Sequence, residues 1–468
     1  MSKVHFIGIC GAAMSAVALL LKQRGWSVSG SDEGFYPPIS DFLRQAGIPF
    51  VTGYAAENIP ADTQMIVIGK HARLVPELNA EVAAAFASGI RICSFPDVLQ
   101  ELTQASENYV IAGSFGKSTS TALMAWILTQ AGKDASYLVG ALSPSLAGNS
   151  YAGSGPQFVL EGDEYPSANW DPSSKFLHYN ADRLLLTSCE HDHFNVFPTL
   201  NEYLAPYRKL VAQPRLKSIV ACSDGAHVPE VLKSATAPIT YYSESDSLAN
   251  WFAQDISQHG SENTFTLIHE SQSVIGLTTK LLGRHNVQNI VGVSALLLGC
   301  NSVTPAELQA GVASFQGVTR RLELKTPTGC VPLYEDFGSS RAKLIAGLQA
   351  VRLQYPTRRL HVVFEPHTFS FRSRSALSWY DDMFALADAV YVFEPPLHGA
   401  GTNEQLSLQE IVDRITASGV QAQSFTDKNQ LPAAIGKLDS TKDVVLVETS
   451  GGIGGSIPFL TEYLVEGI

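Results

Sequence analysis

The strongest chemical signal in the sequence is a glycine-rich segment that follows an apolar strand and opens a helix. It reads Gly113-Ser114-Phe115-Gly116-Lys117-Ser118-Thr119, the shortened G-x-x-G-K-S/T form of a phosphate-binding loop. Glycines let the backbone wrap a phosphate, Lys117 adds positive charge for the outer phosphates, and the Ser118 hydroxyl suits Mg²⁺. We therefore expect ATP to bind here. The alternative is a strand-to-helix turn with a capping serine and a surface lysine.

Two acidic segments follow apolar runs further along the chain, Glu161-Gly162-Asp163-Glu164 and Glu190-His191-Asp192-His193. Open parallel sheets bind their ligands at the carboxyl ends of the strands, where these segments would lie. Next to a phosphate loop, such carboxylates would hold Mg²⁺ that bridges phosphate oxygens. A zinc site at His191 and His193 is the rival interpretation, although zinc would need more Cys or His ligands. The third interpretation is that these residues are solvated acidic side chains of surface loops.

A second glycine loop, Gly8-Ile9-Cys10-Gly11, joins a strand to a helix near the start of the chain. Asp32 lies just past the next strand, where an acidic residue contacts a ribose in dinucleotide folds. The third glycine of the G-x-G-x-x-G pattern is missing. This pattern indicates either a nucleotide site, which need not be for NAD, or close packing of a helix on a strand.

Several later residues could complete a nucleotide site. The run Gly283-Arg284-His285-Asn286-Val287-Gln288-Asn289 opens an apolar helix, so its polar side chains could bind a base edge or cap the helix. Arg320 and Arg321 could stabilise a transferring phosphoryl group, or form surface salt bridges. Asp336 is a candidate ribose acceptor or another helix cap.

Basic groups also follow a strand near the C-terminal end of the chain. Glu365-Pro366-His367 and Arg372-Ser373-Arg374 could together bind a carboxylate. A glycine run at Gly451-Gly452-Ile453-Gly454-Gly455 follows a later strand, with a plain tight turn as the alternative to a functional role.

The elements that must position these residues alternate as short apolar strands and helices, the pattern of parallel sheets covered by helices. A helix is expected at Ala12–Lys22, another carries Leu344, Leu348 and Val351 on one face, and residues 240–282 are less regular. The expected strands are Val4–Ile7, Ser27–Ser29, Met65–Ile68, Val110-Ile111, Phe158–Leu160, Leu184–Leu186, Ser218–Ala221, Leu360–Phe364, Ala389–Phe393 and Val444–Val447.

Length and composition set the organisation of the chain. Its 468 residues predict about three α/β domains, which we place at residues 1–106, 107–322 and 323–468. A net charge of −12 without a long basic run argues against nucleic acid as a partner. The longest apolar stretch, around Ala16–Leu21, is too short to span a bilayer, and no leader pattern precedes Val4. We expect a cytoplasmic protein, a monomer or weak homodimer, with six reduced cysteines.

These segments, in this order, resemble the Mur ligases of peptidoglycan synthesis, and the likeness runs through nearly the whole chain. Gly8-Ile9-Cys10-Gly11, Tyr36-Pro37-Pro38 and Ser174-Lys175-Phe176-Leu177-His178-Tyr179 resemble the branch that attaches the tripeptide L-Ala-γ-D-Glu-meso-diaminopimelate to UDP-N-acetylmuramate. Glu365-Pro366-His367, with Arg372 and Arg374, instead resembles the branch that attaches L-alanine to UDP-N-acetylmuramate.

The resemblance implies an ATP-dependent amide ligase with three domains, a Rossmann-like N-terminal domain, a P-loop-type central ATPase domain and a Rossmann-like C-terminal domain. It assigns the UDP-sugar to Gly8, Gly11 and Asp32, and the incoming peptide to His367 and Arg372. Arg341, which lies beside the place where the family has two histidines, is a further candidate for contact with the peptide. It assigns ATP to Gly113, Ser114, Gly116, Lys117, Ser118 and Thr119, Mg²⁺ to Ser118, Glu161 and His193, adenine to His285 and Asn289, ribose to Asp336 and the phosphates to Arg321. Lys117, Glu161, His193 and Arg321 would be the catalytic residues.

The chain departs from the family pattern at three places. The phosphate loop has Phe115-Gly116-Lys117-Ser118 in place of His-Gly-Lys-Thr, and Ser188 replaces an Asn upstream of the second acidic segment. The family's Asp-x-x-His-His-Pro is here Asp336-Phe337-Gly338-Ser339-Ser340-Arg341, without either histidine. Two other classes are weighed against the ligase, a nicotinamide oxidoreductase, which gives Lys117 no role, and a non-catalytic paralogue that binds UDP-sugar.

Overall fold

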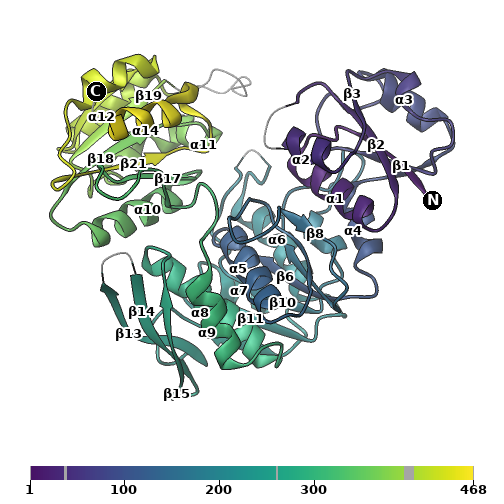
Figure 1. Cartoon of the computed structure of the whole chain (residues 1–468), viewed down its shortest axis with the longest axis horizontal. Helices are drawn as coiled ribbons and strands as arrows, with labels where there is room; N and C mark the ends of the chain where they lie inside the picture. Colours follow the sequence, from purple (N-terminus) through teal and green to yellow (C-terminus); the bar gives the residue numbers. More distant parts are fainter. Residues whose placement is uncertain (1, 36–38, 195, 260–261, 395–404, 467–468) are drawn as a thin grey trace.

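The computed structural model of the chain describes residues 2–35, 39–194, 196–259, 262–394 and 405–466. Figure 1 shows three α/β domains, each built around its own sheet, with the N-terminal (purple) and C-terminal (yellow-green) domains above the central one. The predicted α/β class with three domains is confirmed. The Tyr36-Pro37-Pro38 segment lies outside the described residues.

The N-terminal sheet is wholly parallel, with the order β3-β2-β1-β4-β5 that is typical of nucleotide-binding folds. Its neighbouring strands β1 and β4 are mostly buried, as expected for the middle of a sheet covered by helices on both faces. The elements are β1 (Lys3–Ile7), α1 (Ala12–Gln23), β2 (Ser27–Asp32), α2 (Ile39–Gln45), β3 (Phe50–Thr52), η1 (Ala56–Asn58), β4 (Met65–Ile68), α3 (Ala80–Ala87), β5 (Arg91–Cys93) and α4 (Phe95–Leu102).

The central sheet has ten strands in the order β15-β14-β13-β12-β11-β10-β6-β9-β7-β8. Its parallel middle strands place their carboxyl ends, and the acidic segments after β9 and β10, on the same edge as the glycine loop after β6. The strands are β6 (Glu107–Ala112), β7 (Ser136–Leu138), β8 (Ser150–Tyr151), β9 (Gln157–Glu161), β10 (Arg183–Leu186), β11 (Ser218–Cys222), β12 (Ile239–Tyr242), β13 (Trp251–His259), β14 (Glu262–His269) and β15 (Gln272–Thr279). The helices are α5 (Lys117–Gln130), η2 (Lys175–His178), α6 (Leu200–Val211), α7 (Val228–Leu232), α8 (Arg284–Gly299) and α9 (Pro305–Ser314).

The segment expected to be less regular, 240–282, is in fact regular. It forms β12 and then the antiparallel meander β13-β14-β15. In β14 buried and partly exposed residues alternate, because one face of the meander packs on the core and the other is solvated. Such strands lack the continuous apolar runs by which the parallel strands could be predicted.

The C-terminal sheet has the order β16-β17-β21-β18-β19-β20, parallel except at the β16–β17 edge. The predicted helix face is confirmed, since Leu344, Leu348 and Val351 of α10 are buried. The elements are β16 (Glu323–Leu324), β17 (Leu333–Asp336), α10 (Arg341–Gln354), β18 (Arg359–Phe364), α11 (Phe369–Arg372), η3 (Arg374–Asp381), β19 (Ala389–Phe393), α12 (Leu408–Ala417), β20 (Gln421–Phe425), η4 (Lys428–Gln430), α13 (Leu431–Ile435), β21 (Asp443–Glu448), η5 (Ile453–Gly455) and α14 (Ser456–Glu466).

The predicted domain boundaries fall in the connections between these sheets. Residue 106 lies between α4 and β6, and residue 322 lies between α9 and β16. The boundaries themselves stay a prediction. All six cysteines are free thiols, as expected. In the described part of the chain, no helix combines the length and the apolar character that a membrane crossing requires.

Candidate active site

A cavity of about 1020 Å³ lies where the three domains meet. Its walls come from the start of α1, from the glycine loop and both acidic segments of the central domain, and from the start of α10. The predicted site residues that line it are Ser114, Gly116, Lys117, Ser118, Thr119, Glu161, His193, His285, Asn289, Arg321 and Asp336. The predicted residues that do not line it are Gly8, Gly11, Asp32, Gly113, Arg341, His367 and Arg372.

The glycine loop has the shape of an anion-binding turn, and two of its glycines are required by geometry. Gly113 has φ +138°, and a Cβ there would come 2.1 Å from Thr187 Oγ1. Gly116 has φ +74°, and a Cβ there would come 2.3 Å from Asn289 Oδ1. The loop leads into α5, whose first backbone N–H groups carry no side-chain cap. These N–H groups are therefore available to a phosphate.

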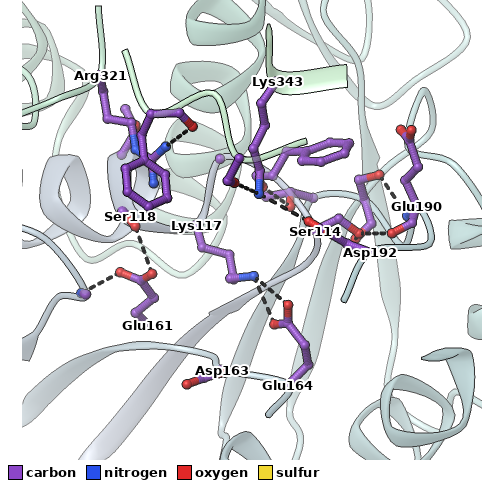
Figure 2. A pocket seen from close by; sticks show the side chains of 18 of the residues that line it. Ser114, Lys117, Ser118, Glu161, Asp163, Glu164, Glu190, Asp192, Arg321 and Lys343 are labelled. Atoms are coloured by element: carbon purple, nitrogen blue, oxygen red, sulfur yellow. Dashed lines mark hydrogen bonds and ion pairs between the residues drawn. The ribbon is translucent and has the colours of Figure 1, made fainter. Parts of the chain in front are cut away.

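Lys117 is mostly buried and paired with a carboxylate, so it is not the surface lysine of the alternative interpretation, a plain strand-to-helix turn. Its side chain is 15% exposed, and its Nζ lies 2.9 Å from Glu164 Oε2 and 2.5 Å from the Gly113 carbonyl oxygen. Burial opposes the charge of Lys117, but the Glu164 carboxylate outweighs burial and raises the lysine pKa. Burial likewise raises the pKa of Glu164, and Lys117 reverses this, lowering it to about 2. The pair is therefore charged at neutral pH (Figure 2).

Ser118 and Glu161 form a second polar pair on the cavity wall. The Ser118 hydroxyl donates to Glu161 Oε1 at 2.8 Å, and the Gly140 N–H donates to Oε2 at 2.6 Å. Burial raises the pKa of Glu161. In Figure 2 this pair and the Lys117–Glu164 pair lie side by side beneath Arg321.

The donor set suits a hard cation. Over the described ranges, no group of three or more His, Cys, Asp or Glu side chains is arranged to hold a metal ion. Mg²⁺ usually takes one or two protein oxygens and completes its shell with water and substrate phosphates. The Ser118 hydroxyl and Glu161 carboxylate, both oxygen donors beside a phosphate loop, fit that requirement.

His193 was predicted to share a magnesium site with Glu161, but in the structure its ring contacts Glu164. His193 Nε2 lies 3.0 Å from Glu164 Oε1, and its Nδ1 lies 2.9 Å from the Tyr165 hydroxyl. His193 adopts a left-handed backbone conformation with φ +57°, which points its ring at these partners. Its predicted role as a magnesium ligand stays a prediction.

Helix α8 brings His285 and Asn289, which lie one turn apart on the same helix face, to the cavity wall. Asn289 packs against Gly116 of the glycine loop and donates to Asn286 Oδ1 at 3.2 Å. Burial, with a smaller effect from Arg321, lowers the pKa of His285 to about 4. His285 is therefore neutral at pH 7, the form suited to contact an uncharged base.

Arg321 and Asp336 close the cavity from the C-terminal side. The Arg321 guanidinium lies 4.6 Å from the centroid of the Phe337 ring and donates to the Phe337 carbonyl oxygen at 3.2 Å. Asp336 Oδ1 accepts from the Leu322 N–H at 3.0 Å. Burial raises the pKa of Asp336, and Arg321 opposes that rise. Arg321 thus presents a fixed cation to the cavity.

The N-terminal glycine loop is held by Asp32. Asp32 Oδ2 accepts from the Cys10 N–H at 2.8 Å, and Gly8 has φ +84°. The loop ends at Gly11, the N-cap of α1, which contributes no side chain to the helix start. The next residues, Ala12 and Ala13, line the shared cavity, so the uncapped start of α1 faces it. This is the geometry of an anion site at a helix N-terminus.

The three residues predicted to bind peptide sit around the C-terminal wall without lining the cavity. Arg341 makes two 2.6 Å hydrogen bonds to the carboxylate of Asp382, the residue that follows η3. Arg372 is 5% exposed, and His367 Nδ1 lies 3.5 Å from Glu365 Oε1. The adjacent residues Thr368, Phe369 and Ser370 do line the cavity. The peptide-binding roles stay predictions.

Sequence reasoning treated Glu164 and Asp192, which line the cavity, only as members of the acidic segments, and gave no role to Lys343, which also lines it. Glu164 and Asp192 lie in the predicted acidic segments, but nothing in the sequence distinguishes them from their acidic neighbours. Lys343 directly precedes the buried Leu344 in an amphipathic helix, and a lysine there is typical of a solvated face. No local signal could have indicated it.

Two family models match the chain, "Mur ligase family, catalytic domain" at residues 3–107 and "Mur ligase middle domain" at residues 111–297. A UDP-N-acetylmuramate–L-alanine ligase of Chlorobium phaeovibrioides is 31% identical over 83% of this chain and 81% of its own length. The UDP-N-acetylmuramate–L-alanyl-gamma-D-glutamyl-meso-2,6-diaminoheptandioate ligase of Haemophilus influenzae is 26% identical over 97% of both chains. The crystal structure of a murein peptide ligase from Psychrobacter arcticus has a TM-score of 0.71 and 26% identity, covering 99% of both chains.

The chain belongs to the Mur ligase family. With its phosphate loop and its three-domain fold, it is an ATP-dependent amide ligase of the Mur type. The alternative of a nicotinamide oxidoreductase is wrong.

Proposed function

We propose that this ligase joins the tripeptide L-Ala-γ-D-Glu-meso-diaminopimelate to UDP-N-acetylmuramate. The observation that carries the proposal is the single cavity where the phosphate loop, the start of α1 and the start of α10 meet. Such a cavity can bring a nucleotide, a UDP-sugar carboxylate and an amine together. The full-length likeness to the Haemophilus influenzae tripeptide ligase supports the choice of acceptor.

Each domain would contribute one substrate. The loop of Gly8 and Gly11, braced by Asp32, would hold the UDP portion with its diphosphate toward the start of α1. The central glycine loop would hold ATP, with His285 near the base and Asp336 near the ribose. Residues of the C-terminal wall beside His367 and Arg372 would hold the peptide, with Arg341 at its edge.

The reaction needs positioning and charge neutralisation more than acid–base chemistry. A carboxylate oxygen of the UDP-sugar attacks the terminal phosphorus, the bond to the bridging oxygen breaks, and ADP leaves. The peptide amine then attacks the acyl carbon, loses a proton, and expels phosphate through a tetrahedral intermediate. Lys117 and Arg321, both directed into the cavity, would stabilise the negative charge in these steps.

Ser118 and Glu161 are the residues that would hold Mg²⁺. When bound, the ion would neutralise the phosphate oxygens that accumulate charge. The hydrogen bond from Ser118 to Glu161 holds these two oxygen donors next to each other beside the glycine loop.

L-alanine is the second candidate acceptor, favoured by the 31% identity to the Chlorobium phaeovibrioides L-alanine ligase. Phosphate release from ATP with UDP-N-acetylmuramate decides between the candidates when L-alanine, dipeptides and the tripeptide are supplied in turn. We expect the tripeptide to give the highest kcat/KM. A preference for L-alanine would support the second candidate, and the absence of phosphate release with every acceptor would support a non-catalytic paralogue. The Lys117→Ala variant controls for contaminating ATPase.

A further inference from the structure

The cavity contains a lysine that the family motifs do not provide. Lys343 lies in the first turn of α10, and its side chain is 20% exposed and lines the cavity. Its Nζ lies 3.3 Å from Asp192 Oδ2 and 3.0 Å from Ser339 Oγ. Figure 2 shows this side chain entering from the α10 side, opposite the carboxylates of Glu161 and Glu164.

Lys343 lies among the positions at which this chain departs from the family pattern. Its ammonium is 5.3 Å from the ring centroid of Phe115, which replaces the histidine of the family's phosphate loop. Its hydrogen-bond partner Ser339 replaces the first histidine of the family's His-His-Pro. Three imidazoles are thus missing from one region, at residues 115, 339 and 340, and one ammonium group lies between the residues that replace them.

The charges around Lys343 favour an anion between it and the phosphate loop. Burial lowers the pKa of Lys343, Asp192 raises it, and the nearby cations Lys117 and Arg321 lower it further. Lys117 and Arg321 repel the Lys343 ammonium group, and an anion bound between these cations would relieve that repulsion. The Ser340 hydroxyl at the start of α10 is also buried, with no hydrogen-bond partner among the residues that the structure describes.

We propose that Lys343 binds the terminal phosphate of ATP and stays in contact with the phosphoryl group during its transfer. The inference rests on the proposed nucleotide site. The backbone of the glycine loop and the start of α5 are suited to the inner phosphates, whereas Lys343 approaches from the C-terminal domain, where the amine acceptor is proposed to bind. The terminal phosphoryl group of ATP would lie between the glycine loop and the C-terminal wall, and it is the group that is transferred.

Nucleotide binding distinguishes this role from a structural one. With Mg²⁺ present, the affinities of ADP and of a non-hydrolysable ATP analogue are measured by calorimetry for the wild type, Lys343→Met and Lys343→Arg. We expect Lys343→Met to weaken analogue binding about tenfold while ADP binding changes less than about twofold, and to lower kcat about 100-fold. Lys343→Arg keeps the positive charge, so it should retain most of the analogue affinity and most of kcat. Lys442→Met, on the exposed side of the same domain, is the matched control.

Three results would overturn the proposal: unchanged analogue affinity in Lys343→Met, equal weakening of ADP and analogue, or a rise only in the KM for UDP-N-acetylmuramate. The last would place Lys343 on the substrate carboxylate instead. If Lys343→Met does not fold because Asp192 loses its partner, Lys343→Gln, which can still donate to Asp192, is judged by the same ratio of affinities. Failure of the wild type to bind either nucleotide would contradict the proposed ATP site itself.

Discussion

Lys117 has both a structural and a chemical role, because it is the charged partner of the buried Glu164. Removing it leaves a carboxylate without its main counter-ion, which costs about 3 kcal/mol of unfolding free energy. It also removes a cation from the transferred phosphate, which lowers the rate of phosphate release about 100- to 1000-fold.

Two variants separate these roles. Lys117→Ala should lower both the melting temperature and the turnover. Lys117→Met with Glu164→Gln removes both charges, so it should recover the melting temperature while turnover stays lost. Thermal unfolding and phosphate release are the two measurements. Near-wild-type phosphate release in either variant would contradict the ATP-site assignment.

Glu161 tests the proposed magnesium site. A neutral amide is a poorer ligand for a hard cation than a carboxylate, so Glu161→Gln should shift the Mg²⁺ dependence of the initial rate to about tenfold higher concentration. Ser118 still offers its hydroxyl in this variant. An unchanged midpoint in the Mg²⁺ titration would move the ion to Asp163, Glu164 or Glu190.

His285 gives a pH dependence whose sign is fixed. The pKa of His285 is about 4 in the folded protein and 6.5 for an ordinary histidine. Between these pH values the unfolded chain binds a proton on His285 that the folded protein does not bind. Stability contributed by neutral His285 is therefore complete above pH 6.5 and is lost as the pH falls toward 4. His285→Asn should lose less melting temperature than the wild type between pH 7.5 and pH 5. Equal losses would show that His285 is not held neutral.

At the scale of elements, the turn between β6 and α5 is a shape that only glycine fits. Gly116→Ala would place a Cβ 2.3 Å from Asn289 Oδ1, in a backbone with φ +74°. Gly132 after α5 has a similar φ of +68° but nothing within 4 Å of its would-be Cβ. Gly116→Ala should weaken ATP binding at least about tenfold, whereas Gly132→Ala should cost only about 1 kcal/mol of stability. Equal ATP affinities in the two variants would contradict the role of the loop.

The sequence predicted the elements that lie in parallel sheets better than the others. Strands such as β4 and β21 are buried on both faces, so β4 and the middle of β21 between Asp443 and Glu448 are apolar runs that could be recognised. The meander β13-β14-β15 alternates buried and exposed residues and was missed, as were the short strands β7 and β8. A strand of two or three residues has no period that a sequence pattern can show.

The part of the candidate site that the sequence predicted consists of motifs whose residue types directly indicate phosphate or metal binding. The glycine loop, Glu161 and Arg321 do line one cavity. The partner of Lys117 could not be predicted, because the choice between Glu161 and Glu164 depends on how the chain turns after β9. The position of Lys343 depends on how the C-terminal domain packs on the central one, which no local pattern encodes.

At the scale of the whole molecule, charge is distributed unevenly. The chain carries a net charge of −12, yet Lys117, Arg321 and Lys343 all line the cavity between the domains. Carboxylates such as Glu161 and Asp192 line the same cavity, so it holds cations for the phosphates beside carboxylates that can face Mg²⁺. Each domain contributes part of this cavity, so the site is complete only when the three are assembled.

The central claim is that a substrate carboxylate is activated in this cavity as an acyl phosphate. UDP-N-acetylmuramate with ¹⁸O in its carboxylate, incubated with ATP and the tripeptide, tests it most directly. The account predicts that mass spectrometry finds one ¹⁸O atom in each released inorganic phosphate, because the carboxylate oxygen that attacked phosphorus leaves with it. Unlabelled phosphate alongside amide formation, or ¹⁸O in AMP, would contradict the account.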